Sequence, residues 1–255
     1  MNVVFLGPTL DRRTAATLCE ADYRPPAQRG DIHQAVARDG ARVIGLIDGY
    51  FEGAPSVWHK EILFALSEEV AVFGAASMGA LRAAELSAFG MVGVGVVAKA
   101  YADGRLAPWD DPFEDDDEVA VVHGPEEIGF AASDAMVDIR ATLAAAAAQD
   151  VLTLADAKAI AASAKQLFYK ERLYDTVLAR ALQDGVPQTA VAALRAFLPT
   201  GRVQQKRADA MALLTRLTQG VDPVHQPFRF ERTLLWQSHV EGAADTNEEA
   251  PWRSR

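Results

Sequence analysis

The sequence predicts an α/β fold with a mainly parallel sheet flanked by helices, followed by an all-helical C-terminal region. In the first half, short apolar runs alternate with helical patterns, the order found in parallel sheets with crossover helices. Beyond about residue 130, helical patterns follow one another without strands between them. We therefore expect an α/β core over residues 1–130 and a helical region packed on it over 131–240. The polar, acidic residues 241–255 are expected to form a disordered tail.

The first predicted elements are a strand, a helix, a loop and a second helix. Residues 3–6 form an apolar, β-like run that a Gly-Pro pair closes. Residues 11–21 have a helical pattern, whereas residues 23–30 carry two prolines and a glycine and are predicted to be a loop. Asp31 is a suitable N-cap for a short helix that Gly40 ends.

The next strand, at 43–47, lacks polar alternation, as expected for a sheet covered on both faces. Further strands are expected at 70–73 and 118–122, and further helices of the core at 56–67 and 77–89. Glycines 90, 93 and 95 interrupt another apolar segment. The C-terminal helices are expected at 136–149, 153–169, 171–183, 188–197 and 203–218, with Thr153 as an N-cap.

The composition excludes several classes of function. The 255-residue chain has a formal net charge of -10. A nucleic-acid groove needs concentrated Lys and Arg, so we expect neither nucleic acid nor an anionic membrane surface as a partner. No apolar run approaches the roughly 20 residues that span a bilayer.

Cysteine usage and the first residues indicate a cytoplasmic protein. Cys19 is the single cysteine, so the chain has no intrachain disulfide and no CxxC metal site, which fits a reducing compartment. The first residues lack the basic start and long apolar run of a signal peptide. Cys19 itself lies in a helical pattern and is interpreted as a small core residue.

The segment 70–86 is the most informative one, because a buried strand leads through small residues into a helix with Ser77 at the turn. This is the context of a nucleophile elbow. Small residues at 74–76 and 79 let strand and helix approach closely, and the turn pushes the Ser77 hydroxyl beyond the sheet edge. The free N–H groups of the first helical turn point at an oxyanion formed there.

The match to the G-x-S-x-G pattern is incomplete, since Ala75 occupies the place of the first glycine. An alternative interpretation makes Ser77 an ordinary N-cap of its helix, a position at which serine is common.

A serine nucleophile needs a base, and the candidates are His59, Lys60 and His123. Residues just past parallel strands gather at one rim, so Asp48, His59, Lys60 and Ser77 are expected to meet there. A lysine base must be neutral, which requires burial that lowers its pKa. The residues alone leave His59 and Lys60 open, and each also has an ordinary structural interpretation. His123 precedes a Gly-Pro turn at a strand end and needs no catalytic role.

Two charged features are interpreted structurally. The acidic run 110–118 matches no EF-hand loop and is expected to be a solvated loop rather than a metal site, although it can also meet a basic partner. Arg82 and Glu85 lie one helical turn apart and are expected to pair, or Arg82 binds a carboxylate terminus near Ser77.

Several co-linear motifs resemble those of the TfuA-like family, and together they span most of residues 3–140. They occur in the family's order at 5–8, 47–51, 57–63, 73–86, 116–120, 123–125 and 138–140. One departure is Asp138, where the family more often has Asn.

The resemblance implies a hydrolase-like accessory protein for peptide backbone thioamidation, a modification of ribosomal peptide natural products. TfuA-like proteins accompany YcaO enzymes and are thought to release sulfide from a thiocarboxylated, ThiS-type sulfur carrier. They also assist the YcaO partner in engaging its peptide substrate. The resemblance further implies a Ser–Lys pair, which becomes Ser77 and Lys60 in this sequence.

The implied mechanism needs no metal and no organic cofactor. Neutral Lys60 takes the Ser77 proton, Ser77 attacks the thiocarboxylate carbon, and backbone N–H groups at Met78 and Gly79 hold the oxyanion. Sulfide leaves, and water hydrolyses the acyl-enzyme. Asp48, His59, Arg82 and His123 are supporting candidates.

Two other interpretations remain open. In the first, the protein is a non-catalytic adaptor that recruits peptide to a YcaO enzyme. In the second it is an ordinary serine esterase, although the downstream Asp-then-His order of that class is missing apart from His123.

Overall fold

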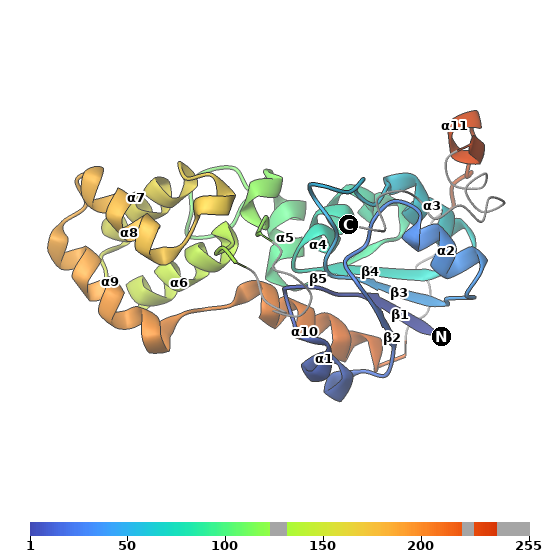
Figure 1. The fold of residues 1–255 in the computed structure, drawn as a ribbon, viewed down its shortest axis with the longest axis horizontal. Coiled ribbons are helices and arrows are strands. Elements are labelled where there is room, and N and C mark those ends of the chain that lie inside the picture. Colours follow the sequence, from blue (N-terminus) through green and yellow to red (C-terminus); the bar gives the residue numbers. More distant parts are fainter. Residues whose placement is uncertain (123–131, 221–226, 239–255) are drawn as a thin grey trace.

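The computed structural model describes residues 1–122, 132–220 and 227–238, and its centre is a five-stranded parallel sheet (Figure 1). All four strand pairs are parallel, and the strand order is β2-β1-β3-β4-β5. The α/β prediction is therefore confirmed. The strands are β1 (Asn2–Phe5), β2 (Asp22–Arg24), β3 (Val43–Leu46), β4 (Ala71–Ala75) and β5 (Val92–Val94).

Two parts of the predicted sheet were wrong. The predicted loop at 23–30 begins with the edge strand β2, whose three partly exposed residues are too few to show a strand pattern. The predicted strand at 118–122 is instead the 3-10 turn η2 (Asp116–Glu118) and an irregular segment. This segment is apolar because it packs between helices, and side chains rather than a neighbouring strand hold it.

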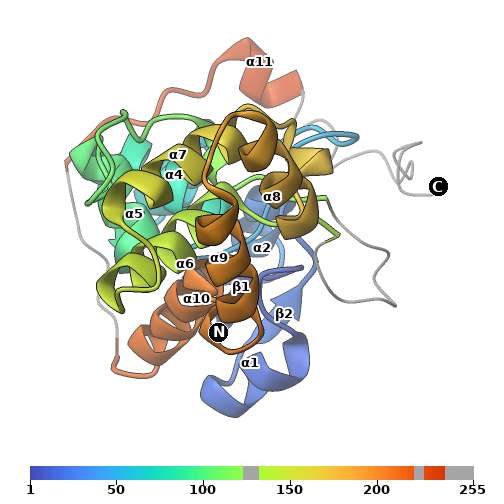
Figure 2. The same ribbon diagram turned by 90° about the vertical axis from the view of Figure 1, so that its left-hand side faces the viewer.

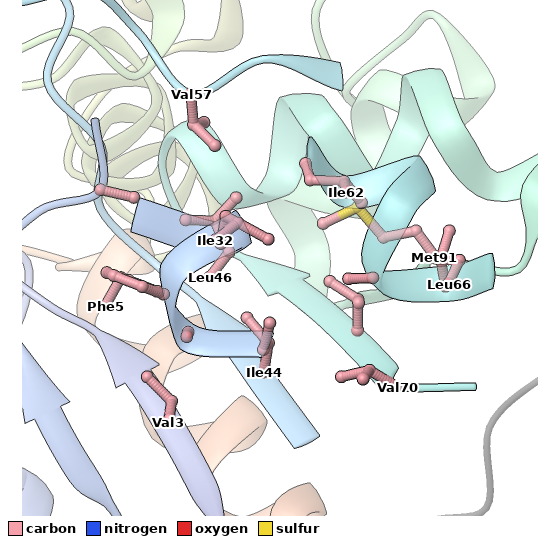
Figure 3. Close-up of a cluster of buried hydrophobic side chains, with 14 of the residues drawn as sticks. Val3, Phe5, Ile32, Ile44, Leu46, Val57, Ile62, Leu66, Val70 and Met91 are labelled. Atoms are coloured by element: carbon pink, nitrogen blue, oxygen red, sulfur yellow. The ribbon is translucent and has the colours of Figure 1, made fainter. Parts of the chain in front are cut away.

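Helices cover both faces of the sheet. Helices α2 (Asp31–Ala37), α3 (His59–Ser67) and α4 (Met78–Leu86) pack on one face. In Figure 3, Phe5 of β1 and Leu46 of β3 lie in one buried cluster with Ile32 of α2 and Ile62 of α3.

The other face is covered by α1 (Arg12–Leu18) and α10 (Gln205–Leu217), which lie together on one side of the sheet in Figure 1. Leu213 and Leu214 of α10 share a core cluster with Val4 and Phe73 of the strands. Cys19 is buried in the same cluster, as predicted, and burial raises the pKa of its thiol.

The link between α10 and α5 (Gly95–Asp103) is a long-range helix cap. The Asp209 carboxylate accepts the Val97 N–H at 2.7 Å, satisfying a donor that the α5 N-terminus leaves open. Gly95 has φ +93°, and a Cβ there would lie 2.3 Å from Asp209 Cγ, so glycine is required at this junction.

The remaining helices form a separate lobe with its own apolar core, seen beside the sheet in Figure 1 and facing the viewer in Figure 2. The predicted N-cap is confirmed, since Thr153 Oγ1 accepts the Asp156 N–H at 3.0 Å. The lobe contains α6 (Met136–Ala148), α7 (Leu154–Lys165), α8 (Tyr174–Gln183) and α9 (Gln188–Gly201), with the short turn η3 (Tyr169–Glu171).

Two short elements complete the description, η1 (Ser87–Phe89) and α11 (Leu234–Trp236). Across the described ranges, no helix combines the length and apolar character that a membrane crossing needs. The predicted tail at 241–255 lies outside the described residues.

Candidate functional site

The strand order places a crevice between β1 and β3. The chain leaves β1 toward β2 and leaves β3 toward β4, in opposite directions along the sheet. In open parallel sheets, ligands bind outside the carboxyl ends of the strands at such a switch point. The segments that follow β1, β3 and β4 at this edge contain Thr9, Asp48 and Ser77.

Asp48 joins the segments that follow β1 and β3. Its carboxylate is 1% exposed and accepts the Gly7 N–H at 2.8 Å, the Thr9 N–H at 3.2 Å and the Thr9 hydroxyl at 2.6 Å. A buried carboxylate with three donors is well compensated for its lost hydration. Asp48 therefore fixes the segment after β1 relative to the segment after β3.

Ser77 lies at a strained turn between β4 and α4. Ala76 has φ +65°, a conformation that costs a residue with a side chain about 1–3 kcal/mol. The Ser77 N–H donates to the Ala75 carbonyl at 2.7 Å, which makes a three-residue turn. Ser77 occupies the N-cap position of α4, as the alternative interpretation expects, but its side chain makes no capping hydrogen bond to the helix. Its half-buried hydroxyl remains available for chemistry.

The predicted close approach of strand and helix is confirmed. A Cβ on Gly74 would lie 2.0 Å from the Gly79 carbonyl oxygen, and one on Gly79 would lie 1.7 Å from the Leu46 carbonyl oxygen. Neither position has room for a side chain.

The oxyanion prediction meets a constraint at Gly79. Its N–H already donates to the Ile47 carbonyl at 3.2 Å, so holding an oxyanion would require that bond to open. Met78 provides the first N–H of α4, where helices lack internal acceptors. The role of both groups stays a prediction.

A small pocket of about 20 Å³ lies beside Ser77. This volume holds roughly one water-sized group. The segment 119–121 forms one wall of this pocket, and its other lining residues, besides Ser77, are Asp48, Gly49, Phe51, Met78 and Leu81.

Side chains of the helical part hold this wall segment, residues 119–121, in place. The Lys206 ammonium donates to the Val119 carbonyl at 2.7 Å, and Ser133 Oγ accepts the Val122 N–H at 2.9 Å. Just before the wall, the Glu118 carboxylate receives two hydrogen bonds from Arg140, each 2.9 Å long. The wall of the Ser77 pocket is therefore built from groups far apart in sequence.

The interpretation of the run 110–118 as a solvated loop holds for its outer residues, since Asp110 is 84% and Asp115 70% exposed, but it misses the end of the run, which forms buried ion pairs. Glu118 is 1% exposed and Arg140 is 2% exposed, and Arg140 also pairs with Asp111. Arg172, fully buried, binds Asp117 through two contacts of 2.9 and 3.0 Å. The network fastens the run to the helical lobe.

Sequence reasoning missed Lys206, which is 4% exposed. Burial lowers the pKa of its ammonium, while the carboxylates of Asp48 and Asp138 act in the opposite direction. The available signal was periodicity, since Lys206 continues the buried face of Ala210, Leu213 and Leu217 by one turn.

Lys60 lies in a different environment. Its ammonium donates to Thr233 Oγ1 at 3.1 Å and sits 5.5 Å from the centre of the Phe230 ring. Its predicted pairing with Ser77 stays a prediction, and the contacts that the structure describes for Lys60 are with the segment 227–238.

His59 and Arg82 both bind Glu85. His59 Nε2 lies 2.8 Å and the Arg82 guanidinium 2.7 Å from the Glu85 carboxylate, so the predicted Arg82–Glu85 pair is confirmed. Glu85 is more than two helical turns beyond Ser77, roughly 12 Å along the α4 axis. The structure thus brings Asp48 to Ser77 and gathers His59 and Arg82 further along α4. His123 lies outside the described residues.

Residues 48–173 match the sequence model of a family described as TfuA-like protein. The chain belongs to the TfuA-like family. The matched part of this TfuA-like protein includes Asp48, Lys60, Ser77 and Arg140, whereas Lys206 follows it. No curated protein matches the chain.

Two residues of the last TfuA-like motif have clear structural roles. Asp138 Oδ1 accepts the Lys206 N–H at 2.9 Å and so caps the start of α10, and burial raises the pKa of Asp138 to about 6. Arg140, two positions later, holds Glu118. This motif connects α6 both to α10 and to the wall of the Ser77 pocket.

Proposed function

We propose that this TfuA-like protein is a serine hydrolase that releases sulfide from a thiocarboxylated, ThiS-like carrier and supports a YcaO enzyme in peptide backbone thioamidation. The observation that carries the proposal is the Ser77 turn. A hydroxyl without a capping bond, at a strained turn and beside a small pocket, is the arrangement of an exposed nucleophile rather than of a structural serine.

The proposed reaction has two steps. Ser77 Oγ attacks the thiocarboxylate carbon while a lysine accepts its proton, and the C–S bond then breaks as the same lysine returns that proton to the sulfur, so that sulfide leaves as HS⁻. Water next attacks the ester, with the same lysine moving protons, and regenerates Ser77 and a carrier carboxylate. The small pocket beside Ser77 is of a size to take sulfide or the attacking water, because it holds roughly one such group.

Two lysines are candidates for the base. The family resemblance assigns Lys60. The physical requirement is a neutral amine at working pH, and burial of Lys206 lowers its pKa in that direction, against the raising effect of Asp48 and Asp138. Lys206 bonds to Val119 in the wall of the Ser77 pocket and lies in the field of Asp48, which lines the same pocket. In the described conformation the environment favours Lys206.

The test is sulfide release from a thiocarboxylated carrier protein by the wild type and by Ser77→Ala. Ser87→Ala is a matched control, since Ser87 lies just past the other end of α4 and bonds only to its own turn. We expect release by the wild type and by the control, and none above background by Ser77→Ala.

Complex formation with the YcaO enzyme is measured on the same variants. An unchanged complex without sulfide release separates hydrolysis from support of the partner. Equal background release by wild type and folded Ser77→Ala would contradict the hydrolase proposal. The interpretation of the protein as a non-catalytic adaptor would then be favoured.

A further inference from the structure

A second and much larger cavity, of about 350 Å³, opens at the same edge of the sheet. This volume is at the lower end of the range for small-ligand sites, which often lie between domains and at switch points of parallel sheets. It lies between the segment after β1, the start of α6 and the α9–α10 junction. Its lining includes Thr9, Asp134, Tyr174, Arg202, Gln204 and Lys206.

The large cavity adjoins the Ser77 pocket. Val121 lines both of them, as part of the wall segment 119–121. The hydrogen bond of 2.6 Å between Thr9 and Asp48 joins the lining of the large cavity to the lining of the small one. The two cavities therefore share a wall that includes Val121 and the Thr9–Asp48 pair.

The charges of the lining indicate what kind of ligand fits. The lining is not a basic site, because Asp11, Asp134 and Asp138 accompany Arg202, Arg207 and the candidate base Lys206. A nucleotide or another polyanion would favour a basic site instead. Balanced donors and acceptors match the alternating C=O and N–H groups of an extended main chain.

The cavity also has groups that can guide a chain. Arg202 lies across the Tyr174 ring at 4.5 Å and pairs with Asp134, which forms an ordered cation and aromatic surface. Arg207 approaches Asp11 at 3.6 Å, a weaker pair on the opposite side. The exposed Gln204 lies at the junction between these basic residues.

We propose that this cavity is the binding site for an extended C-terminal peptide whose last carbonyl reaches Ser77 past the shared wall. The inference rests on the proposed function, because only a chain-end substrate must pass from the large cavity to the serine. The Ser77 pocket is too small for more than the reacting group, so the residues before it occupy the adjoining space.

The test blocks the cavity without touching Ser77. Gln204→Trp places an indole at the α9–α10 junction, and Ala208→Trp adds the same group one turn further along α10, on an exposed position outside the lining. Binding of a synthetic peptide with the carrier's C-terminal residues is measured by calorimetry. We expect about tenfold weaker binding for Gln204→Trp, equal to a loss of roughly 1.4 kcal/mol, and wild-type binding for Ala208→Trp.

Kinetics separate this proposal from the proposed function. Gln204→Trp should raise KM for sulfide release from the carrier severalfold, whereas Ala208→Trp, outside the lining, should keep the wild-type KM. Wild-type peptide affinity and KM in folded Gln204→Trp would overturn the binding site, even if sulfide release by the wild type is established. If Gln204→Trp weakens peptide binding but the wild type releases no sulfide, the hydrolase proposal is contradicted and the peptide-binding site is supported.

Discussion

Lys60 and Lys206 are in opposite environments, although each lies on a helix that packs against the sheet. Lys60 belongs to a motif close to the site in sequence, yet its ammonium contacts Thr233 and Phe230 of the C-terminal segment. Lys206 is distant in sequence and buried next to the wall of the Ser77 pocket. Closeness in sequence to a motif does not decide how deeply a lysine is buried, and burial is what lowers the pKa of Lys206.

The largest expected effect is on catalysis. Lys206→Met should lower kcat/KM for sulfide release by about 10²–10⁴-fold, the usual contribution of a general base, while Lys60→Met changes it little. A lysine base is active when neutral, so the wild-type rate should rise with pH through the lowered pKa of Lys206, and the residual rate of Lys206→Met should lack this rise.

The reverse pattern, with loss in Lys60→Met and a normal rate in folded Lys206→Met, would assign the base to Lys60. Thermal unfolding of both variants accompanies the kinetics, because Lys206→Met also leaves the Val119 carbonyl without its donor.

The next effect concerns the surface that covers Lys60. Trp236 is fully buried, with ring centres 5.4 Å from both His33 and Phe64. Trp236→Ala should lower the free energy of unfolding by about 3–5 kcal/mol, measured by urea denaturation. Leu234→Ala, at a position 84% exposed, is the matched control and should change it by less than about 0.5 kcal/mol. Equal losses in both variants would show that the segment is not anchored through Trp236.

A pH effect is expected at Glu61, next to Lys60 on α3. Burial raises the pKa of its carboxyl to about 7, although the N–H groups of Gly30, His33 and Trp58 partly compensate. The native state then binds this proton more tightly than the unfolded chain. Its contribution is full below the unfolded pKa near 4.5 and is lost as pH rises through about 7, by about 3 kcal/mol.

Glu61→Gln should therefore flatten the fall in the free energy of unfolding between pH 4.5 and 7. Denaturation curves of both proteins across this range measure it. An identical slope in the variant would show that another group causes the pH dependence.

The smallest effect is expected at the Lys60–Thr233 contact. Exposed contacts of this kind contribute about 0–1 kcal/mol. Thr233 Oγ1 also caps α11 by accepting the Trp236 N–H at 3.3 Å, so Thr233→Val should lower the unfolding free energy by about 1–2 kcal/mol. A sulfide-release rate that differs severalfold between Thr233→Val and wild type would contradict the separation of Lys60 from catalysis.

Local features of the site were predictable from the sequence. The strand, the small-residue turn and the helix around Ser77 follow from composition within one short segment, and Gly74 and Gly79 lie where contact with a backbone oxygen leaves no room for a Cβ. The Arg82–Glu85 pair follows from helical spacing alone. Each of these depends on residues near one another in the chain.

Features formed by distant residues were not predictable. Glu118 can be buried only because Arg140 pairs with it. The wall residue Val119 is likewise held by a distant residue, Lys206. A lysine in a polar stretch carries no signal of burial except its place on the face of α10. The acidic run looked solvated because its partners Arg140, Lys165 and Arg172 come from a later lobe.

The position of α10 has a consequence for how the chain folds during synthesis. The five strands leave the ribosome early, but the part of the sheet face that α10 covers, with Val4 and Phe73, stays open until α10 follows the whole helical lobe, because α1 covers only the rest. Asp209, the cap of α5, arrives equally late. A nascent chain thus carries a half-covered apolar sheet while the helical lobe is made, a period in which such surfaces bind chaperones or aggregate. Completion of α10 is the event that closes the fold.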